Sequence, residues 1–224
     1  DRDAGANVKD LAGKFETSRY LSGHSDLVAL LVLSHQTQMH NLITLVNYKT
    51  RIALHEEAKA GRNVESPSEE AQAQYKAPAE ALLEYLLFAD EAPLKGPVAG
   101  TSDFAREFSA RGPRDPRGRS LRDFDLERRL FKYPCSYLVY SEAFDALPGP
   151  AKTYLYARLL DVLTGRDTSP AFARLSADDR RDVLEILLAT KPGLPEAWRK
   201  AHDDPPKGER PSQVAPAASP ASCP

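Results

Sequence analysis

A single long helical pattern, from residue 25 to about residue 61, constrains the fold of this chain more than any other feature. At 1.5 Å per residue such a helix is about 50 Å long, so the other elements must pack along its length. Its apolar stripe advances by three and four residues, through Val28, Leu31, His35, Met39, Leu42 and Val46. Because His35 falls where leucine is typical, the pattern directs an imidazole towards the core. Ser25 is the expected N-cap, with Asp26 in the first turn.

Helical patterns continue along the chain, and no alternating apolar run is long enough to predict a strand. The expected segments are a helix opened by Ser66 and Pro67, a short helix around Phe104 and Phe108, a charged amphipathic segment at 121–129, helices at 135–147 and 151–164, a helix opened by Ser176, and a last turn anchored by Trp198. We therefore predict an all-α fold, an irregular helical bundle packed around the long helix.

The composition of the flanking segments sets the domain boundaries. We expect residues 1–24 to form an irregular N-terminal arm and residues 25–202 to form one all-α domain. Within that domain a long loop rich in Pro, Gly and Arg spans about 92–120. Residues 203–224 are mainly Pro, Ala, Ser and charged residues, which cannot bury enough apolar surface to offset the entropy of ordering. We predict that this tail is disordered.

Charge and hydropathy exclude several classes of protein. The chain has 30 basic and 32 acidic residues, a net charge of −2 at pH 7, so no overall field attracts nucleic acid. The longest mainly apolar run, at 27–33, is far shorter than the ~20 residues that cross a bilayer, so we expect no membrane span. The chain starts without Met, which indicates a processed or truncated product of a longer protein.

The spacing of the histidines argues against a metal site. His35 and His40 are five residues apart, which separates them by roughly 140° on a helix, and His24 precedes the helix. No His-Glu-x-x-His or Glu-x-x-His motif is present, and without Cys-x-x-Cys-His the chain cannot attach a c-type haem itself. Two interpretations of His35 remain open: a neutral core histidine bonded to a carbonyl or hydroxyl, or, beside Met39, a ligand or neighbour of a haem.

A polar row follows another face of the same helix, through Gln36, His40, Thr44, Asn47, Arg51 and His55. It is either a solvated face or a groove for a partner. Gln36, Asn47 and Arg51 are candidate partner-binding residues, together with Arg119 and Arg122 of an Arg-rich loop. Acidic residues interleave with those arginines, so the pattern favours an ion-paired surface over a nucleic-acid footprint.

Cys135 is the remaining candidate for chemistry. It stands among Tyr133, Tyr137 and Tyr140, whose spacing favours amphipathic packing. It is a possible reactive thiol only if a histidine base approaches it in space. The second cysteine, Cys223, lies in the tail, and no thiol pair has metal-ligand or redox spacing.

Two stretches of the chain resemble a known family. The first contains Asp-Ala-Gly-Ala-Asn-Val-Lys-Asp-Leu at 3–11, Tyr-Leu-Ser-Gly-His-Ser-Asp at 20–26 and His-Gln-Thr-Gln-Met-His-Asn-Leu at 35–42. The second contains Arg-Ser-Leu-Arg-Asp-Phe-Asp-Leu at 119–126, Tyr-Pro-Cys-Ser-Tyr-Leu at 133–138 and Phe-Asp-Ala-Leu-Pro at 144–148. Together they resemble the C-terminal region of a largely uncharacterised family of exported bacterial proteins whose N-terminal part is cytochrome-c-like.

The resemblance implies a periplasmic or otherwise exported protein in which haem c is held by an upstream part absent from this chain. His24, His35 and His40 match the family pattern, whereas Ser34 replaces its usual acidic residue, which argues against an acid–base or metal role for the adjacent His-Gln pair. We expect a non-catalytic helical domain of a haem-associated electron-transfer or sensing protein, with His24, His35, Met39 and His40 towards the cofactor and the haem-bearing part as its partner. The alternative is a cofactor-free interaction module that uses the polar helix face and the Arg-rich loop, and an enzyme centred on Cys135 ranks last.

Overall fold

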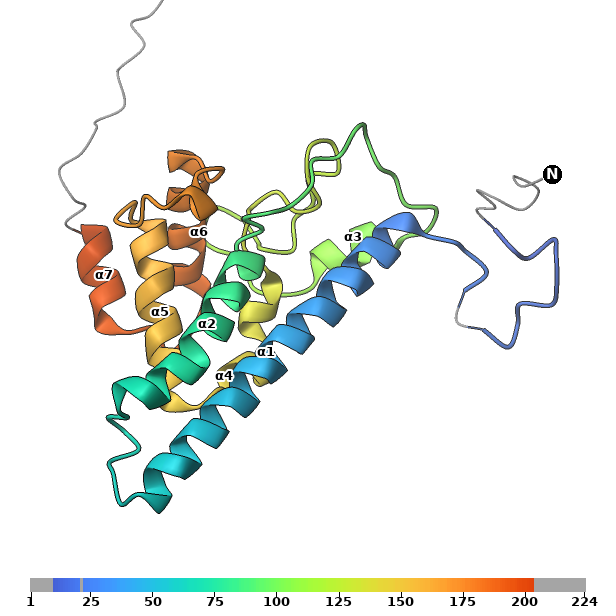
Figure 1. The fold of residues 1–224 in the computed structure, drawn as a ribbon. Helices are drawn as coiled ribbons and strands as arrows, with labels where there is room; N and C mark the ends of the chain where they lie inside the picture. The colour runs from blue at the N-terminus through green and yellow to red at the C-terminus, as the bar shows by residue number, and fades with distance from the viewer. Residues whose placement is uncertain (1–9, 21, 204–224) are drawn as a thin grey trace, which may run out of the picture.

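The long helix forms as expected and organises the molecule. In this computed structural model, which describes residues 10–20 and 22–203, α1 covers Leu27–Lys59. It pairs with α2 (Glu69–Leu86), and α2 in turn packs against α5 (Gly149–Leu163), α5 against α6 (Ala177–Thr190) and α6 against α7 (Glu196–Asp203). Figure 1 shows α1 along one edge of this stack and the C-terminal helices towards the other. Within the described residues no β-strand forms, so the predicted all-α class is confirmed.

The predicted ends of the chain are tested only in part. Residues 1–9 of the predicted arm and residues 204–224 of the predicted tail lie outside the described residues. Residues 10–20 and 22–24 of the arm contain no helix, and their regular feature is an isolated antiparallel bridge between Asp10 and His24. No described helix has the length and apolar character needed to span a membrane.

The start of α1 differs by one residue from the prediction. Asp26, not Ser25, is the N-cap, because its Oδ1 accepts the N–H of Ala29 at 3.0 Å. Its Oδ2 also accepts the N–H groups of Thr101 at 3.1 Å and Ser102 at 3.0 Å. A Cβ at Gly100 would lie 2.7 Å from that carboxylate, so glycine permits the close approach. Asp26 thereby ties the long loop to the start of α1.

The start of α2 also moves, because Ser68 caps it through the N–H of Ala71 in place of the predicted Ser66. Pro78 lies inside the helix and does not end it. Between α1 and α2, the enclosed carboxylate of Glu57 accepts two bonds from Arg62 and two from Ser68, which fixes the turn. These bonds, led by the one from Arg62, lower the pKa of Glu57 to about 2.

Two predicted helices are wrong. Residues 121–129 are irregular, because the Asp125 carboxylate caps the backbone N–H groups of Glu127 and Arg128 and because Leu126 has φ +59°. An isolated bridge between Phe124 and Phe131 replaces helical pairing there. The predicted helix at 135–147 divides into a 3₁₀ turn, η1 (Tyr137–Tyr140), and one short turn, α4 (Glu142–Asp145), since Ser141 adopts an extended conformation and caps α4.

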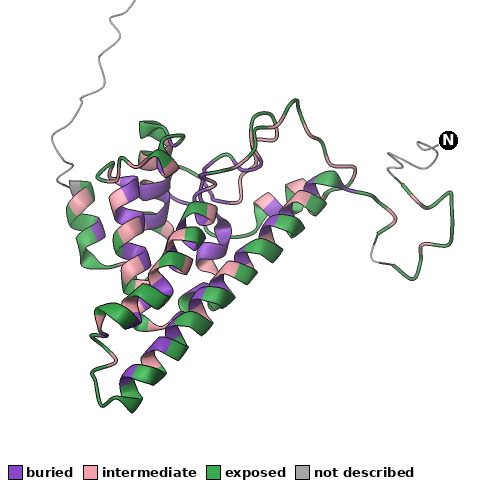
Figure 2. Cartoon of the chain, in the orientation of Figure 1, coloured by how far each residue is buried: buried purple, intermediate pink, exposed green. Residues whose placement is uncertain are grey.

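The remaining short elements lie at the edges of the stack. They are α3 (Phe104–Ala110), which contacts α1, and the 3₁₀ turn η2 (Pro170–Phe172) between α5 and α6. One core joins all of these elements, and α1 contributes a single buried stripe to it (Figure 2). The stripe runs through Val28, Val32, His35, Met39, Ile43, Val46, Thr50, Ala53 and Glu57.

Candidate functional site

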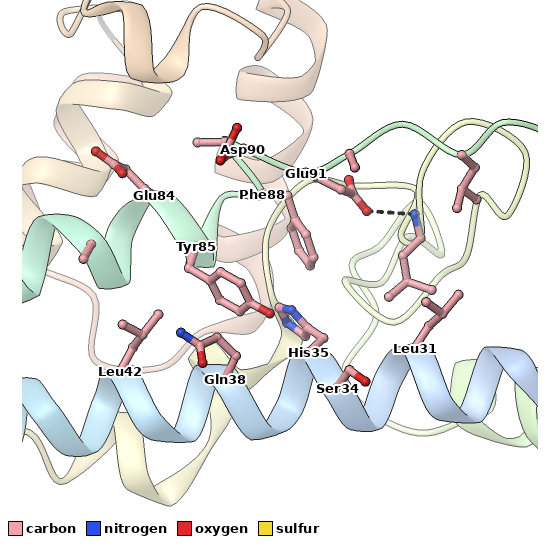
Figure 3. Close-up of a pocket in the computed structure, with 15 residues that line it drawn as sticks. Leu31, Ser34, His35, Gln38, Leu42, Glu84, Tyr85, Phe88, Asp90 and Glu91 are labelled. Carbon is pink, nitrogen blue, oxygen red and sulfur yellow. Dashed lines mark hydrogen bonds between the residues drawn. The ribbon is translucent and has the colours of Figure 1, made fainter.

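A cavity of about 540 Å³ opens between α1 and the C-terminal end of α2, directly above His35 (Figure 3). Its apolar walls come from α1, from α2 and the segment after it, and from the irregular segment near Leu130. The volume lies within the ~300–1,000 Å³ range of small-molecule sites. Three segments that are distant in the sequence therefore build one ligand-sized site. The residues that line this cavity include Leu31, His35, Glu84, Tyr85, Phe88 and Glu91.

His35 forms the floor of the cavity and is held on several sides. Its Nε2 lies 2.7 Å from Ser136 Oγ in a buried hydrogen bond. Its ring stacks on Tyr85, with centroids 5.2 Å apart, and on Phe88, at 4.6 Å. Burial lowers the pKa of His35 to about 4, so the imidazole is neutral at pH 7. The side chain is thus a fixed, uncharged surface, which matches the interpretation of a core histidine bonded to a hydroxyl.

The backbone at Phe88 is unusual. This residue follows the C-cap of α2 with φ +53°, a left-handed conformation that favours glycine. The N–H of Ala89 donates to Glu84 O at 2.9 Å and that of Phe88 to Tyr85 O at 3.3 Å, the two bonds of a Schellman cap. The strained conformation places the Phe88 ring on His35, where it also meets Phe131 at 5.7 Å.

Carboxylates supply the charge around the cavity. Glu84 and Asp90 are exposed at its rim, and Glu91 is half-buried (Figure 3). Glu91 Oε1 accepts the N–H of Leu130 at 3.0 Å, yet burial raises the pKa of its carboxyl. Among the described residues that line the cavity, none is Lys or Arg. The site therefore combines aromatic walls with three carboxylates and no basic side chain in its described lining.

The structure does not bring the histidines together. His24 is exposed in the arm, His40 is half-buried on another face of α1 from His35, and Met39 is fully enclosed in the core. Within the described part of the chain, no three His, Cys, Asp or Glu side chains are grouped to hold a metal ion. His35 does not fit the role of a haem ligand, because Ser136 engages its Nε2 and aromatic rings stack on the imidazole.

The candidate partner-binding residues of α1 are partly accessible. Arg51 Nε donates to Asn47 Oδ1 at 2.6 Å, and both residues line a shallow hollow beside α4. Gln36 instead accepts a bond from the Tyr137 hydroxyl at 3.3 Å. The predicted polar row is therefore divided between solvent and internal contacts.

Both candidate arginines of the loop have internal contacts. Arg119 is buried and ion-paired with Asp115, Asp182 and Glu185, which fastens the loop to α6. Arg122 lies over the rings of Phe108, at 4.5 Å, and Tyr137, at 4.6 Å. The ion pairing that the sequence pattern favours therefore holds for Arg119, whereas Arg122 contacts aromatic rings.

Cys135 has no accessible surface, and burial strongly raises the pKa of its thiol. The nucleophilic thiolate is therefore not populated near neutral pH, which argues against the reactive thiol considered from the sequence. No imidazole bonds to its sulfur among the described residues, and the thiol makes a long contact, at 4.0 Å, with the Ser136 carbonyl.

Sequence reasoning missed Ser136, Phe88 and the three carboxylates. A signal existed only for Ser136, which stands beside Cys135 in the Tyr-Pro-Cys-Ser-Tyr run. Comparison with known proteins adds no assignment, because no family model, no curated protein and no solved structure matches this chain.

Proposed function

We propose that this chain is a non-catalytic helical domain that binds a small organic cation with a flat apolar body in the cavity above His35. The observation that carries the proposal is the composition of that cavity: aromatic and aliphatic walls, three carboxylates, and neither Lys nor Arg among its described lining residues. Organic cations match this chemistry, because the face of an aromatic ring and a carboxylate both attract positive charge.

Among the three carboxylates that line the cavity, that of Glu91 is the one that is half-buried. Burial raises its pKa, while one backbone N–H serves one oxygen. Arg129 and Arg174 partly offset the effect of burial from a neighbouring hollow. Arg129 is paired with Asp179 at 2.7 Å, and Arg174 Nη1 donates to the Glu91 carbonyl at 2.8 Å. A cation entering from the cavity would stabilise the charged form of Glu91.

His35 suits a binding role better than a catalytic one. A general base must reach its substrate with a pKa near the working pH, whereas the pKa of His35 is lowered to about 4 and its Nε2 is engaged by Ser136. The ring instead offers a rigid edge that positions Tyr85 and Phe88 for stacking with a planar ligand.

Three probes of matched shape test the proposal: 2-naphthamidine, 2-naphthamide and 2-naphthoate, which are cationic, neutral and anionic. Calorimetric titration at pH 7 should show at least ~10-fold tighter binding of the amidinium than of the amide, and weakest binding of the carboxylate. Equal affinity for the amidinium and the amide would contradict a cation site.

Variants locate the binding. Glu84→Gln and Asp90→Asn change exposed rim residues, and each should weaken amidinium binding by about 3- to 10-fold without affecting the amide. Glu107→Gln is the matched control, because Glu107 is exposed on α3, away from the cavity lining. An equal loss in the control would indicate general surface attraction.

Association with a haem-bearing part, export to the periplasm and a role in electron transfer remain predictions. His24 and His40 are the candidates left for a cofactor held elsewhere, since His35 and Met39 are enclosed. Absorption spectra of the native protein, with His24→Ala and His40→Ala compared with wild type, test this expectation separately from the cavity.

A further inference from the structure

The face of α1 that points away from the core is apolar and has no partner within the described chain. Figure 2 shows it as a continuous exposed edge. Large side chains lie along it that are 43 to 64% exposed: Leu27, Leu30, Leu33, Leu45, Tyr48 and Ile52. From Leu27 to Tyr48 the sequence has no Asp, Glu, Lys or Arg. Lys49 and Arg51 are exposed beside its C-terminal end, before Ile52. A strip that is uncharged over more than twenty residues is typical of a protein interface rather than of a solvated helix.

The order of these residues is symmetric along the helix. Pairing Leu27 with Ile52, and Leu30 with Tyr48, joins residues on the same side of the helix and gives midpoints at residues 39 to 40. Leu33 and Leu45 have the same midpoint but lie about 120° apart around the helix, on opposite edges of the face. Between the two apolar groups the exposed positions are polar and uncharged, at Ser34, Thr37, Gln38, Asn41 and Thr44, and all of these except Gln38 are symmetric about the same centre. In a two-fold dimer residue i of one copy meets residue j of the other and j meets i.

We propose that this face binds a second copy of the chain, with the two α1 helices antiparallel and crossing near residues 39 to 40. Each group of three apolar residues would then cover the opposite group of the partner. The uncharged centre lets the helices approach closely, and Thr37 of each copy lies opposite Asn41 of the other.

The size of the strip sets the expected strength. From Leu27 to Ile52 it is about 38 Å long and about 10 Å wide, or roughly 400 Å² per copy, half of the ~800 Å² of a standard interface. We therefore expect a weak dimer with a dissociation constant on the order of 10 to 100 µM. Sedimentation velocity of the full chain from about 5 to about 500 µM should show concentration-dependent dimerisation in that range.

Charge substitutions test the antiparallel pairing. Leu30→Glu and Tyr48→Arg should each weaken the dimer at least ~10-fold, because a charge would be buried against an apolar group. The double variant brings the new glutamate of one copy opposite the new arginine of the other, and should recover to within about 3-fold of wild type. Tyr20→Glu is the matched control, since Tyr20 is equally exposed but lies in the arm.

Circular dichroism establishes that each variant is folded, which the exposure of both positions favours. A wild-type chain that stays monomeric at about 500 µM would overturn the proposal and leave the face to a different partner. A double variant that dimerises no better than the single variants would overturn the antiparallel pairing.

Discussion

The C-terminal ends of α1 and α2 are capped by the same pair of backbone hydrogen bonds but have different residues in the left-handed position. After α1, the N–H of Arg62 donates to Glu57 O at 2.9 Å and that of Gly61 to Ala58 O at 3.0 Å. After α2, the N–H groups of Ala89 and Phe88 make the equivalent bonds. The left-handed residue is Gly61 in the first cap, with φ +68°, and Phe88 in the second, with φ +53°.

Gly61 belongs to a turn with a structural role only, whereas Phe88 belongs to the candidate site. A Cβ at Gly61 would meet nothing within 4 Å, so the turn needs only the conformational freedom of glycine. At Phe88 the chain accepts a strain of about 1 kcal/mol, and the ring packs on His35 in return. The strained residue lies at the cavity, where a side chain is needed.

The largest effect is expected from Phe88→Ala, which removes the ring and keeps the strain. Full burial of phenylalanine makes its loss worth about 3–5 kcal/mol, so the half-buried Phe88 should account for about 2–4 kcal/mol of unfolding free energy. Naphthamidine binding should fall at least ~10-fold, because the aromatic wall is lost. Urea denaturation and calorimetry measure the two effects.

Phe15→Ala provides the comparison for that variant. Phe15 is an exposed phenylalanine of the arm that touches Tyr20, and its loss should change stability by less than about 0.5 kcal/mol. If both alanine variants unfold at the same urea concentration, the Phe88 ring is not a structural part of the cavity.

The stability of the cavity and that of the turn after α1 should depend on pH over different ranges, through His35 in the first and Glu57 in the second. Burial lowers the pKa of His35 from 6.5 to about 4, so the folded state binds this proton less readily than the unfolded state. The stability linked to neutral His35 is complete above pH 6.5 and is lost as the pH falls from 6.5 to 4, by at most roughly 3 kcal/mol. Glu57, whose pKa is lowered from 4.5 to about 2, stabilises the turn after α1 above pH 4.5, and this stability is lost as the pH falls from 4.5 to 2.

Urea denaturation at pH 7, 5.5 and 4.5 measures the pH dependence of the unfolding free energy for the wild-type chain and for two variants. His35→Phe should flatten the loss of stability between pH 6.5 and 4.5, whereas Glu57→Gln should leave that part of the pH dependence nearly unchanged. A His35→Phe chain that loses stability as steeply as wild type would assign the dependence to other groups.

Sequence periodicity sufficed to predict α1, the buried position of His35 and the all-α class. Those features depend on repeats of three and four residues within one segment, which a sequence displays directly. The prediction for residues 121–129 was wrong because the Asp125 side chain bonds to nearby backbone N–H groups in competition with the helix. The spacing of apolar residues carries no information about that competition.

The candidate site was only partly predictable. His35 stood out within its stripe, but its partner Ser136 is 101 residues away in the sequence, and the carboxylates come from the end of α2. The rule that a helix stops at glycine also misses Phe88, where tertiary packing overrides the local preference of the backbone.

The smallest effects test whether backbone strain really distinguishes the two caps. Gly61→Ala should destabilise the chain by about 1 kcal/mol, because alanine meets the left-handed penalty and gains no contact. Phe88→Gly should be about 1 kcal/mol more stable than Phe88→Ala, because both lack the ring and only glycine relieves the strain. Glycine is thus favoured over alanine at both caps, whereas phenylalanine is favoured over both at position 88, where His35 receives the ring. An alanine variant as stable as the glycine variant at position 88 would show that the α2 cap carries no strain, and the contrast between the two helix ends would then rest on packing alone.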